Sequence, residues 1–179
     1  MTAQSWRALR TKKYQFSLRL FLFLNAVSGL FTLVFPLYEV RAVSVPAILL
    51  FVASTLLLIW HGKYTHKKIN IPFISVISGI LWAWHITLKY NAMNHSDYTF
   101  LLIALLCVLF IGSIAFANNI IAFTFHSLPS VLACLWLNGS EHGIRIIYLM
   151  ALPMAGIAIQ HVIQKRYDDF AQQLMSKLD

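Results

Sequence analysis

Residues 98–137 read YTFLLIALLCVLFIGSIAFANNIIAFTFHSLPSVLACLWL, an apolar run that is interrupted near its middle by Asn118 and Asn119. A helix needs roughly 20 apolar residues to cross the hydrocarbon core of a membrane. The run holds about forty residues, which is too many for one span and suits two. We therefore expect two transmembrane helices that are joined by a tight hairpin at the two amides.

The rest of the chain has the same character. Of its 179 residues, 59% are hydrophobic and 11% are charged, whereas a soluble domain carries roughly 25% charge. The mean hydropathy is +0.71. No polar segment is long enough to build a separate water-soluble core. The composition predicts an integral membrane protein, in which Cys107 and Cys134 are buried, inert thiols because each lies inside an apolar run.

Six segments meet the length test for a membrane span, and short connections separate them. They are Leu18 to Tyr38, Val43 to Trp60, Ile71 to Leu88, Tyr98 to Ala117, Ile120 to Leu137 and Ile146 to Ile163. Short loops make consecutive helices antiparallel neighbours. The predicted fold class is an all-α integral membrane protein, a six-transmembrane-helix bundle whose last helix extends into a cytoplasmic coiled-coil seam.

Basic residues are distributed unequally between the two sides that six spans define. With the N-terminus inside, eleven Lys and Arg residues fall on the cytoplasmic side and three, Arg41, Lys89 and Arg145, fall outside. The positive-inside rule then places both termini in the cytoplasm. Because the basic residues flank apolar runs, we expect them to contact anionic membrane lipids and expect no nucleic-acid partner.

Aromatic residues and a histidine gather in the outer half of the third span. Trp82 and His85 are three residues apart and share a helix face, with Trp84 beside them. One interpretation is an interfacial aromatic belt. The other is the lining of a ligand pocket for a hydrophobic signal that enters between the helices, formed by Trp82, Trp84, His85 and Trp136.

Several polar or helix-bending residues lie toward the inner ends of the first, fifth and sixth spans. Ionisable groups at membrane depth are costly and indicate function by default. We hypothesise a polar, switchable core formed by Asn25, His126, Pro129, Pro153, Gln160 and His161. His126 and His161 could also ligate a haem, but no third ligand or carboxylate accompanies them. We expect interhelical hydrogen bonds rather than a metal site.

Motifs of soluble catalysis are absent from the sequence. There is no Gly-rich phosphate loop, no GxSxG, no HExxH and no pair of carboxylates within a span. We expect no catalytic residues in this chain. A small transporter or channel remains an alternative, although the few intramembrane polar residues and the lack of an internal repeat argue against it.

An apolar seam continues from the last span into the polar C-terminal stretch. It consists of Ile163, Tyr167, Phe170, Leu174 and Leu178, spaced by steps of four, three, four and four. This spacing is typical of the a and d positions of a coiled coil. It predicts a homodimer; the alternative is a helix that lies on the membrane surface.

The C-terminal LMSKLD resembles the junction at which a diguanylate cyclase (GGDEF) domain begins, with Asp179 as the Asp of the D-x-L/M-T-G-x-x-N-R motif. The six-span, short-looped region before it resembles the MASE type of membrane-associated sensor domain. The resemblance implies a cytoplasmic basic segment at 1–17, a sensor domain at 18–163 and a signalling helix at 164–179 that leads to an output domain. The GGDEF signature itself does not occur.

These observations favour a sensor and dimerisation module of the bacterial inner membrane. The resemblance implies an output that makes cyclic di-GMP from two GTP, so that GTP and Mg belong to the output domain and this chain itself has no cofactor. The alternative within the same class is the input domain of a six-span histidine kinase for a hydrophobic autoinducer. A haem-binding membrane protein is the alternative of another class.

Overall fold

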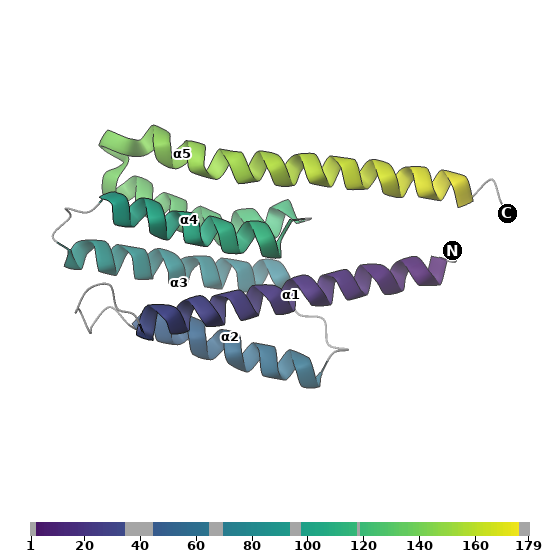
Figure 1. Ribbon diagram of the computed structural model, residues 1–179, viewed down its shortest axis with the longest axis horizontal. Helices are drawn as coiled ribbons and strands as arrows, with labels where there is room; N and C mark the ends of the chain where they lie inside the picture. The colour runs from purple at the N-terminus through teal and green to yellow at the C-terminus, as the bar shows by residue number, and fades with distance from the viewer. Residues whose placement is uncertain (1–2, 35–44, 65–69, 94–97, 118, 176–179) are drawn as a thin grey trace.

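Long helices, all aligned with one axis, make up the computed structural model of the protein (Figure 1). It describes residues 3–34, 45–64, 70–93, 98–117 and 119–175. In these ranges all regular structure is helical. The helices are α1 (Ala3–Val34), α2 (Val45–Lys63), α3 (Ile71–Ala92), α4 (Tyr98–Ala115) and α5 (Ile120–Met175).

Helix α5 consists of two arms that meet at Asn138, whose backbone is not helical (φ −150°, ψ 27°). We call Ile120–Asn138 the first arm and His142–Phe170 the second arm. The chain reverses at this break, so that the second arm returns along the bundle (Figure 1). The Asn-Gly pair at 138–139 suits such a break, because both residues favour turns over helix interiors.

The described residues contain six helices that are long and apolar enough to cross a membrane. Their bounds are Tyr14–Val34, Val45–Lys63, Ile71–Ala92, Tyr98–Ala115, Ile120–Asn138 and His142–Phe170. The predicted all-α, six-span architecture is confirmed, and the hairpin expected between the fourth and fifth spans is present, since α4 ends at Ala115 and α5 begins at Ile120. The protein is a multi-pass membrane protein.

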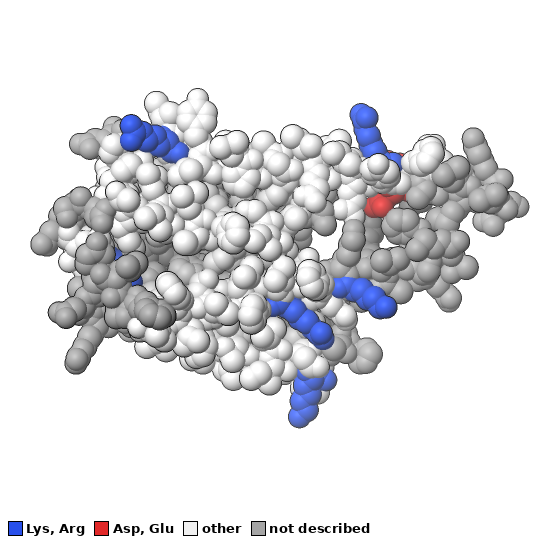
Figure 2. All heavy atoms as spheres, in the orientation of Figure 1, with Lys and Arg blue, Asp and Glu red and all other residues white. Residues whose placement is uncertain are grey.

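Both ends of the chain lie at the same end of the bundle, here called the terminal end. The start of α1 and the end of α5 project there beyond the other helices (Figure 1). On the face shown in Figure 2, much of the described surface between the two ends carries no charged side chain. A charge-free belt of this kind is what the hydrocarbon core of a bilayer requires.

Local hydrogen bonds satisfy polar groups that lipid cannot. Asn119 Oδ1 accepts a hydrogen bond from the Ala122 N–H at 3.1 Å and caps the start of α5. The hydroxyls of Thr32, Ser75 and Thr87 each donate to the carbonyl four residues earlier in the same helix, at 2.9 Å. Backbone and hydroxyl groups paired within one helix make that helix compatible with a membrane.

Large apolar side chains fill the centre of the bundle. Phe21, Phe116 and Phe123 are buried together with Leu105 and Ile86. Helix α3 packs mainly against α5 and also contacts α2 and α4, while α1 packs against α2 and α4.

Of the two cysteines, Cys134 is buried as predicted; the prediction for Cys107 is wrong, because its side chain is exposed. An apolar run cannot distinguish a lipid-facing position from a buried one, since both are apolar.

Candidate functional site

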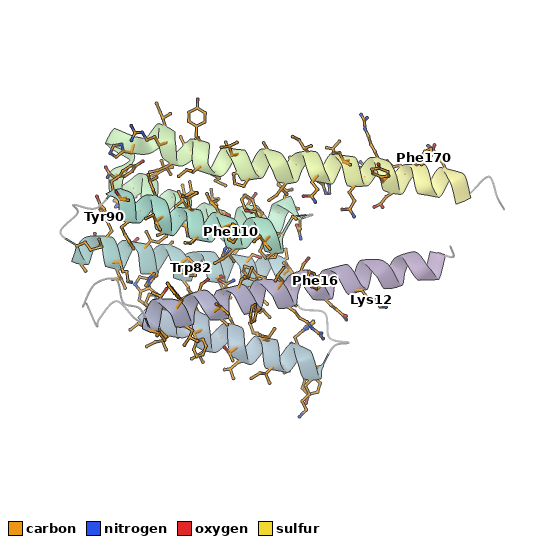
Figure 3. The ribbon with its side chains drawn as sticks, in the orientation of Figure 1. Lys12, Phe16, Trp82, Tyr90, Phe110 and Phe170 are labelled. Carbon is orange, nitrogen blue, oxygen red and sulfur yellow. The ribbon has the colours of Figure 1, made fainter. Side chains whose placement is uncertain are left out.

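A hydrogen-bonded polar network joins α1 to α3 in the interior of the bundle. Asn25 Oδ1 accepts hydrogen bonds from Ser78 Oγ at 2.9 Å and from Trp82 Nε1 at 2.8 Å. The Asn25 amide nitrogen donates to the Phe21 carbonyl at 2.9 Å. Asn25 is fully buried, and Trp82 lies where α3 faces α1 (Figure 3). Such interhelical bonds fix the rotation of two helices about their axes.

His126, on the first arm of α5, lies in the same layer of the bundle. Its ring makes edge contacts with Phe21, at 5.0 Å between centroids, and with Phe116, at 6.3 Å. The side chain is fully buried. The backbones of Ser75 and Val108 face the ring, yet neither ring nitrogen makes a hydrogen bond of normal geometry within the described residues. An imidazole held in this way is costly and marks a candidate switch.

Two glycines bring the neighbouring helices close to His126. A Cβ atom at Gly79 of α3 would overlap the His126 carbonyl oxygen and lie 3.0 Å from that of Phe125. A Cβ atom at Gly112 of α4 would lie 3.0 Å from His126 Cδ2. Because Pro129 has no N–H, the Phe125 carbonyl loses its partner within the helix. Gly79 therefore lets the α3 backbone approach the carbonyl that the proline leaves without that partner.

Two serines flank Pro129 on the same arm. Ser127 and Ser130 are fully buried, and neither hydroxyl has a hydrogen-bond partner among the residues that the structure describes. Together with His126 they place several unsatisfied polar atoms within about one helical turn. We call this set and the Asn25 network the polar layer; it consists of Asn25, Ser78, Trp82, His126, Ser127 and Ser130.

The four aromatic and histidine residues of the predicted ligand pocket do not all meet. Trp82 and His85 are buried and in contact, with 5.9 Å between ring centroids at an interplanar angle of 82°. Trp84 lies on an exposed face of α3, and Trp136 is 89% exposed near the end of the first arm. The structure thus brings Trp82 and His85 together and places Trp84 and Trp136 at the surface.

Some residues of the predicted polar core are buried and others are exposed. Asn25 and His126 are fully buried, and Pro129 is half-buried. On the second arm, Gln160 and His161 are exposed and Pro153 is half-buried. His126 and His161 are therefore not brought together. Within the described ranges no group of three His, Cys, Asp or Glu side chains could hold a metal ion.

The predicted C-terminal seam begins on the exposed surface of the second arm. Helix α5 continues without interruption from this span to Met175. Ile163, Tyr167 and Phe170 are 50%, 71% and 60% exposed, and Phe170 lies on the projecting part of the arm (Figure 3). The side chains of Leu174 and Leu178 lie outside the described residues.

Sequence reasoning missed Ser78, Gly79 and Gly112. A signal for Ser78 was present: Asn25 must find partners in a membrane, and Ser78 and Trp82 are four apart on one face of α3. The glycines gave no such signal, since their role depends on which helices pack together. For the same reason Trp82 was predicted to contact the interface or a ligand rather than Asn25.

The chain matches no protein-family model, no curated protein and no solved structure. No family is therefore identified, and the proposed function rests on the six-span architecture, the polar layer and the C-terminal seam. The protein is an all-α, multi-pass membrane protein with six candidate spans.

Proposed function

We propose that this chain is a membrane sensor and dimerisation module that transmits a stimulus to a C-terminal output domain, a diguanylate cyclase. The observation that carries the proposal is the apolar seam of the second arm. Tyr167 and Phe170 are exposed where the arm projects beyond the bundle. The arm His142–Phe170 has 29 residues, about nine more than a crossing needs, so its end leaves the membrane. The apolar surface there needs a cover, and a second copy of the same seam supplies one with twofold symmetry.

The way the second arm is attached suits a moving element. Near its beginning, the His142 ring stacks on Tyr98 of α4 with 3.7 Å between centroids, and Ile146 is fully buried. After Ile157, none of the described side chains of the arm is buried. From Ile157 to Phe170 the helix extends about 20 Å. An arm that is packed near one end and exposed toward the other converts a small shift of the bundle into a larger shift of the seam.

The polar layer is the element that biases this shift. Its first-arm members, His126, Ser127 and Ser130, carry polar atoms that have no hydrogen-bond partner of normal geometry in the part of the chain that the structure describes. A second packing of the bundle that pairs those atoms differs from the first by the worth of a few interhelical hydrogen bonds, about 1 kcal/mol each. A stimulus that binds one packing better shifts the population toward it. Trp82 and His85 are where a hydrophobic signal would contact this layer.

The output follows from the resemblance to MASE sensor domains. Diguanylate cyclases of that architecture bring two GGDEF domains face to face to condense two GTP into one cyclic di-GMP. The spacing and rotation of two second arms would control that encounter. The excess of positive charge at the terminal end supports a cytoplasmic location for both termini in the bacterial inner membrane, with GTP and Mg bound by the output domain.

Cysteine cross-linking in membranes tests the seam. Cys107→Ala and Cys134→Ala first remove the native thiols. Single cysteines then replace Tyr167 or Phe170 on the seam, and Lys165 or Asp169 on the opposite face of the same helix. We expect a cross-linked dimer for the two seam positions, because their side chains meet at the twofold axis, and none for the two control positions.

Equal cross-linking at all four positions would mean that copies collide at random. Cross-linking at Lys165 and Asp169 alone would place the interface on the other face. Either result contradicts the proposed dimer. Because Lys165 and Asp169 are exposed like the seam residues, reagent access cannot explain a difference between the two faces.

The diguanylate cyclase assignment has its own test. A cyclase catalytic domain is joined after Asp179, and two or seven residues are inserted into the connecting helix. Seven residues restore the phase of a coiled coil and two turn it by about half a turn. We expect cyclic di-GMP synthesis to persist with seven residues and to fall with two. Synthesis that is indifferent to both insertions would contradict control through the seam.

A further inference from the structure

Arg19 is a charged residue inside the first membrane span. It follows the first residue of that span, Tyr14, by little more than one helical turn. Its Nε donates a hydrogen bond to His61 Nδ1 of α2 at 3.4 Å. His61 is buried, whereas Arg19 is exposed. A buried histidine thus orients an exposed guanidinium at the point where α1 and α2 meet.

No acidic side chain on α1 to α4 neutralises the positive charge of Arg19. Helices α1 to α4 contain no Asp and no Glu. Nδ1 of His61 accepts the hydrogen bond and therefore carries no proton, and a neutral imidazole does not neutralise the charge of Arg19. A guanidinium has five N–H donors, and the bond to His61 uses the one at Nε. The two terminal amino groups remain, and their geometry suits two oxygens of one phosphate or carboxylate.

The end of α2 carries one charged and two aromatic side chains. Lys63 Nζ lies 5.7 Å from the centroid of the Tyr64 ring, and the Trp60 and Tyr64 rings are 6.0 Å apart. Trp, Tyr and Lys at the end of a span are typical of the depth of the lipid head groups. On the face shown in Figure 2, Lys and Arg side chains gather over the terminal ends of α1 and α2, away from the acidic side chain near the end of α5.

Exposed apolar side chains lie near Arg19 on α1 and on the neighbouring helix α2. Phe16 and Phe23 lie three residues before and four residues after it, on the same face of α1, and are 67% and 52% exposed. Leu56 and Ile59 of α2 are 62% and 65% exposed. A molecule with an anionic head and long apolar chains matches this combination, whereas a free anion matches the head site alone.

We propose that Arg19 of α1, beside the last turn of α2, forms a binding site for the phosphate of an anionic phospholipid. Arg19 binds the phosphate oxygens with its two terminal amino groups, and His61 positions the guanidinium. The acyl chains lie along the apolar surface on the bundle side of Arg19. The site does not depend on the proposed sensor function, because it uses no residue of the seam or of the polar layer.

The test uses the full chain in a neutral detergent. The probes are phosphatidylglycerol, phosphatidylcholine and inorganic phosphate, and the readouts are lipids retained in native mass spectrometry and the midpoint of thermal unfolding. For the wild type we expect phosphatidylglycerol at a hundredfold excess over its dissociation constant to raise the midpoint by roughly 5–10 °C. Phosphatidylcholine should have little effect.

Three variants locate the site. Arg19→Gln should weaken phosphatidylglycerol binding by about tenfold or more, because a charge-assisted bidentate contact is lost. Arg19→Lys keeps the charge but loses the paired geometry, and should bind between the wild type and Arg19→Gln; it also serves if Arg19→Gln does not fold. Arg145→Gln, which removes an exposed arginine at the opposite end of the bundle, should bind like the wild type.

Each other outcome overturns the proposal. A full response to phosphatidylglycerol in both Arg19 variants excludes Arg19 as the ligand. Equal loss in Arg145→Gln, or equal protection by phosphatidylcholine, means that binding is not specific to this site or to anionic lipid. If inorganic phosphate protects as well as phosphatidylglycerol does, the site is a free-phosphate site and the lipid assignment is wrong.

Discussion

The two arms of α5 have similar hydropathy, 1.8 and 1.9, but very different surroundings. Over an 18-residue apolar stretch of each arm, 39% of the residues are buried inside the protein in the first arm and 11% in the second. Each arm carries a proline and a histidine, Pro129 with His126 and Pro153 with His161. The same residue types are therefore used once in the interior and once at the surface.

The difference shows which contacts hold this membrane protein together. In a membrane, apolar area alone gives no preference for helix over lipid, so close packing and hydrogen bonds decide association. The first arm has the close packing, in the approach of Gly79 to the His126 carbonyl, and it lies beside the hydrogen-bonded network that joins α1 to α3 at Asn25. The second arm is much less buried, and in the proposed dimer it would make such contacts with a second copy.

The largest effect is expected where the backbones are closest. Gly79→Ala places a methyl group against the His126 and Phe125 carbonyls, and neither backbone can move aside easily. We expect a loss of about 3 kcal/mol in the free energy of unfolding, at the upper end of the cost of overpacking. The measurement is unfolding in mixed micelles of rising sodium dodecyl sulfate content, followed by tryptophan fluorescence.

Gly156→Ala on the second arm is the matched control. A Cβ atom there meets nothing within 4 Å, and alanine is the better helix former by about 0.5–1 kcal/mol. Gly156→Ala should therefore be neutral or slightly stabilising. Similar losses for both glycines would show that the arms are held alike and would remove the basis of the comparison.

The next effect concerns the interhelical network. Asn25→Leu leaves Ser78 Oγ and Trp82 Nε1 without their acceptor in the interior. We expect a loss of about 2 kcal/mol in unfolding free energy, since membrane hydrogen bonds contribute about 1 kcal/mol each. Gln160→Leu, an exposed amide on the second arm, should change stability by less than about 0.5 kcal/mol. Additive effects of Asn25→Leu and Ser78→Ala would contradict a direct bond between the two residues.

The sequence predicted the elements better than their contacts. The second span was expected at Val43 to Trp60 and is Val45–Lys63, because span length and hydropathy depend only on the chain itself. The burial of Trp82 and the exposure of Trp84 depend instead on how α3 is rotated against α1. Lipid-facing and helix-facing positions are equally apolar, so periodicity could not decide between them.

His161 and Gln160 illustrate the same limit within the candidate site. Their depth in the span matched that of His126 on the neighbouring span, and depth was the only quantity that the sequence supplied. The structure turns them outward, which only the packing of the second arm decides. The seam has a clearer pattern in the sequence, since its apolar residues recur with a period of 3.5 among polar neighbours, and its pairing stays a prediction.

A smaller effect, of opposite sign, is expected at His126. Its two ring nitrogens are buried without hydrogen bonds of normal geometry in the described residues. His126→Leu removes them at similar volume, and we expect a gain of about 1 kcal/mol in unfolding free energy. His161→Leu should be neutral to within about 0.5 kcal/mol. If His126→Leu is as destabilising as Asn25→Leu, the ring has partners in the membrane and the switch hypothesis loses its unsatisfied group.

The variant with the smallest expected change in stability tests most directly whether the second arm of α5 serves association rather than the fold. Phe170→Ser changes a side chain that is 60% exposed, so the unfolding free energy of the monomer should stay within about 0.5 kcal/mol of the wild type. Cross-linking through a cysteine at position 167 should nevertheless fall, because the aromatic cover of the seam is lost. Loss of stability with cross-linking unchanged would mean that the second arm belongs to the bundle as the first arm does. Loss of cross-linking with stability unchanged would leave association as the only role of the exposed seam.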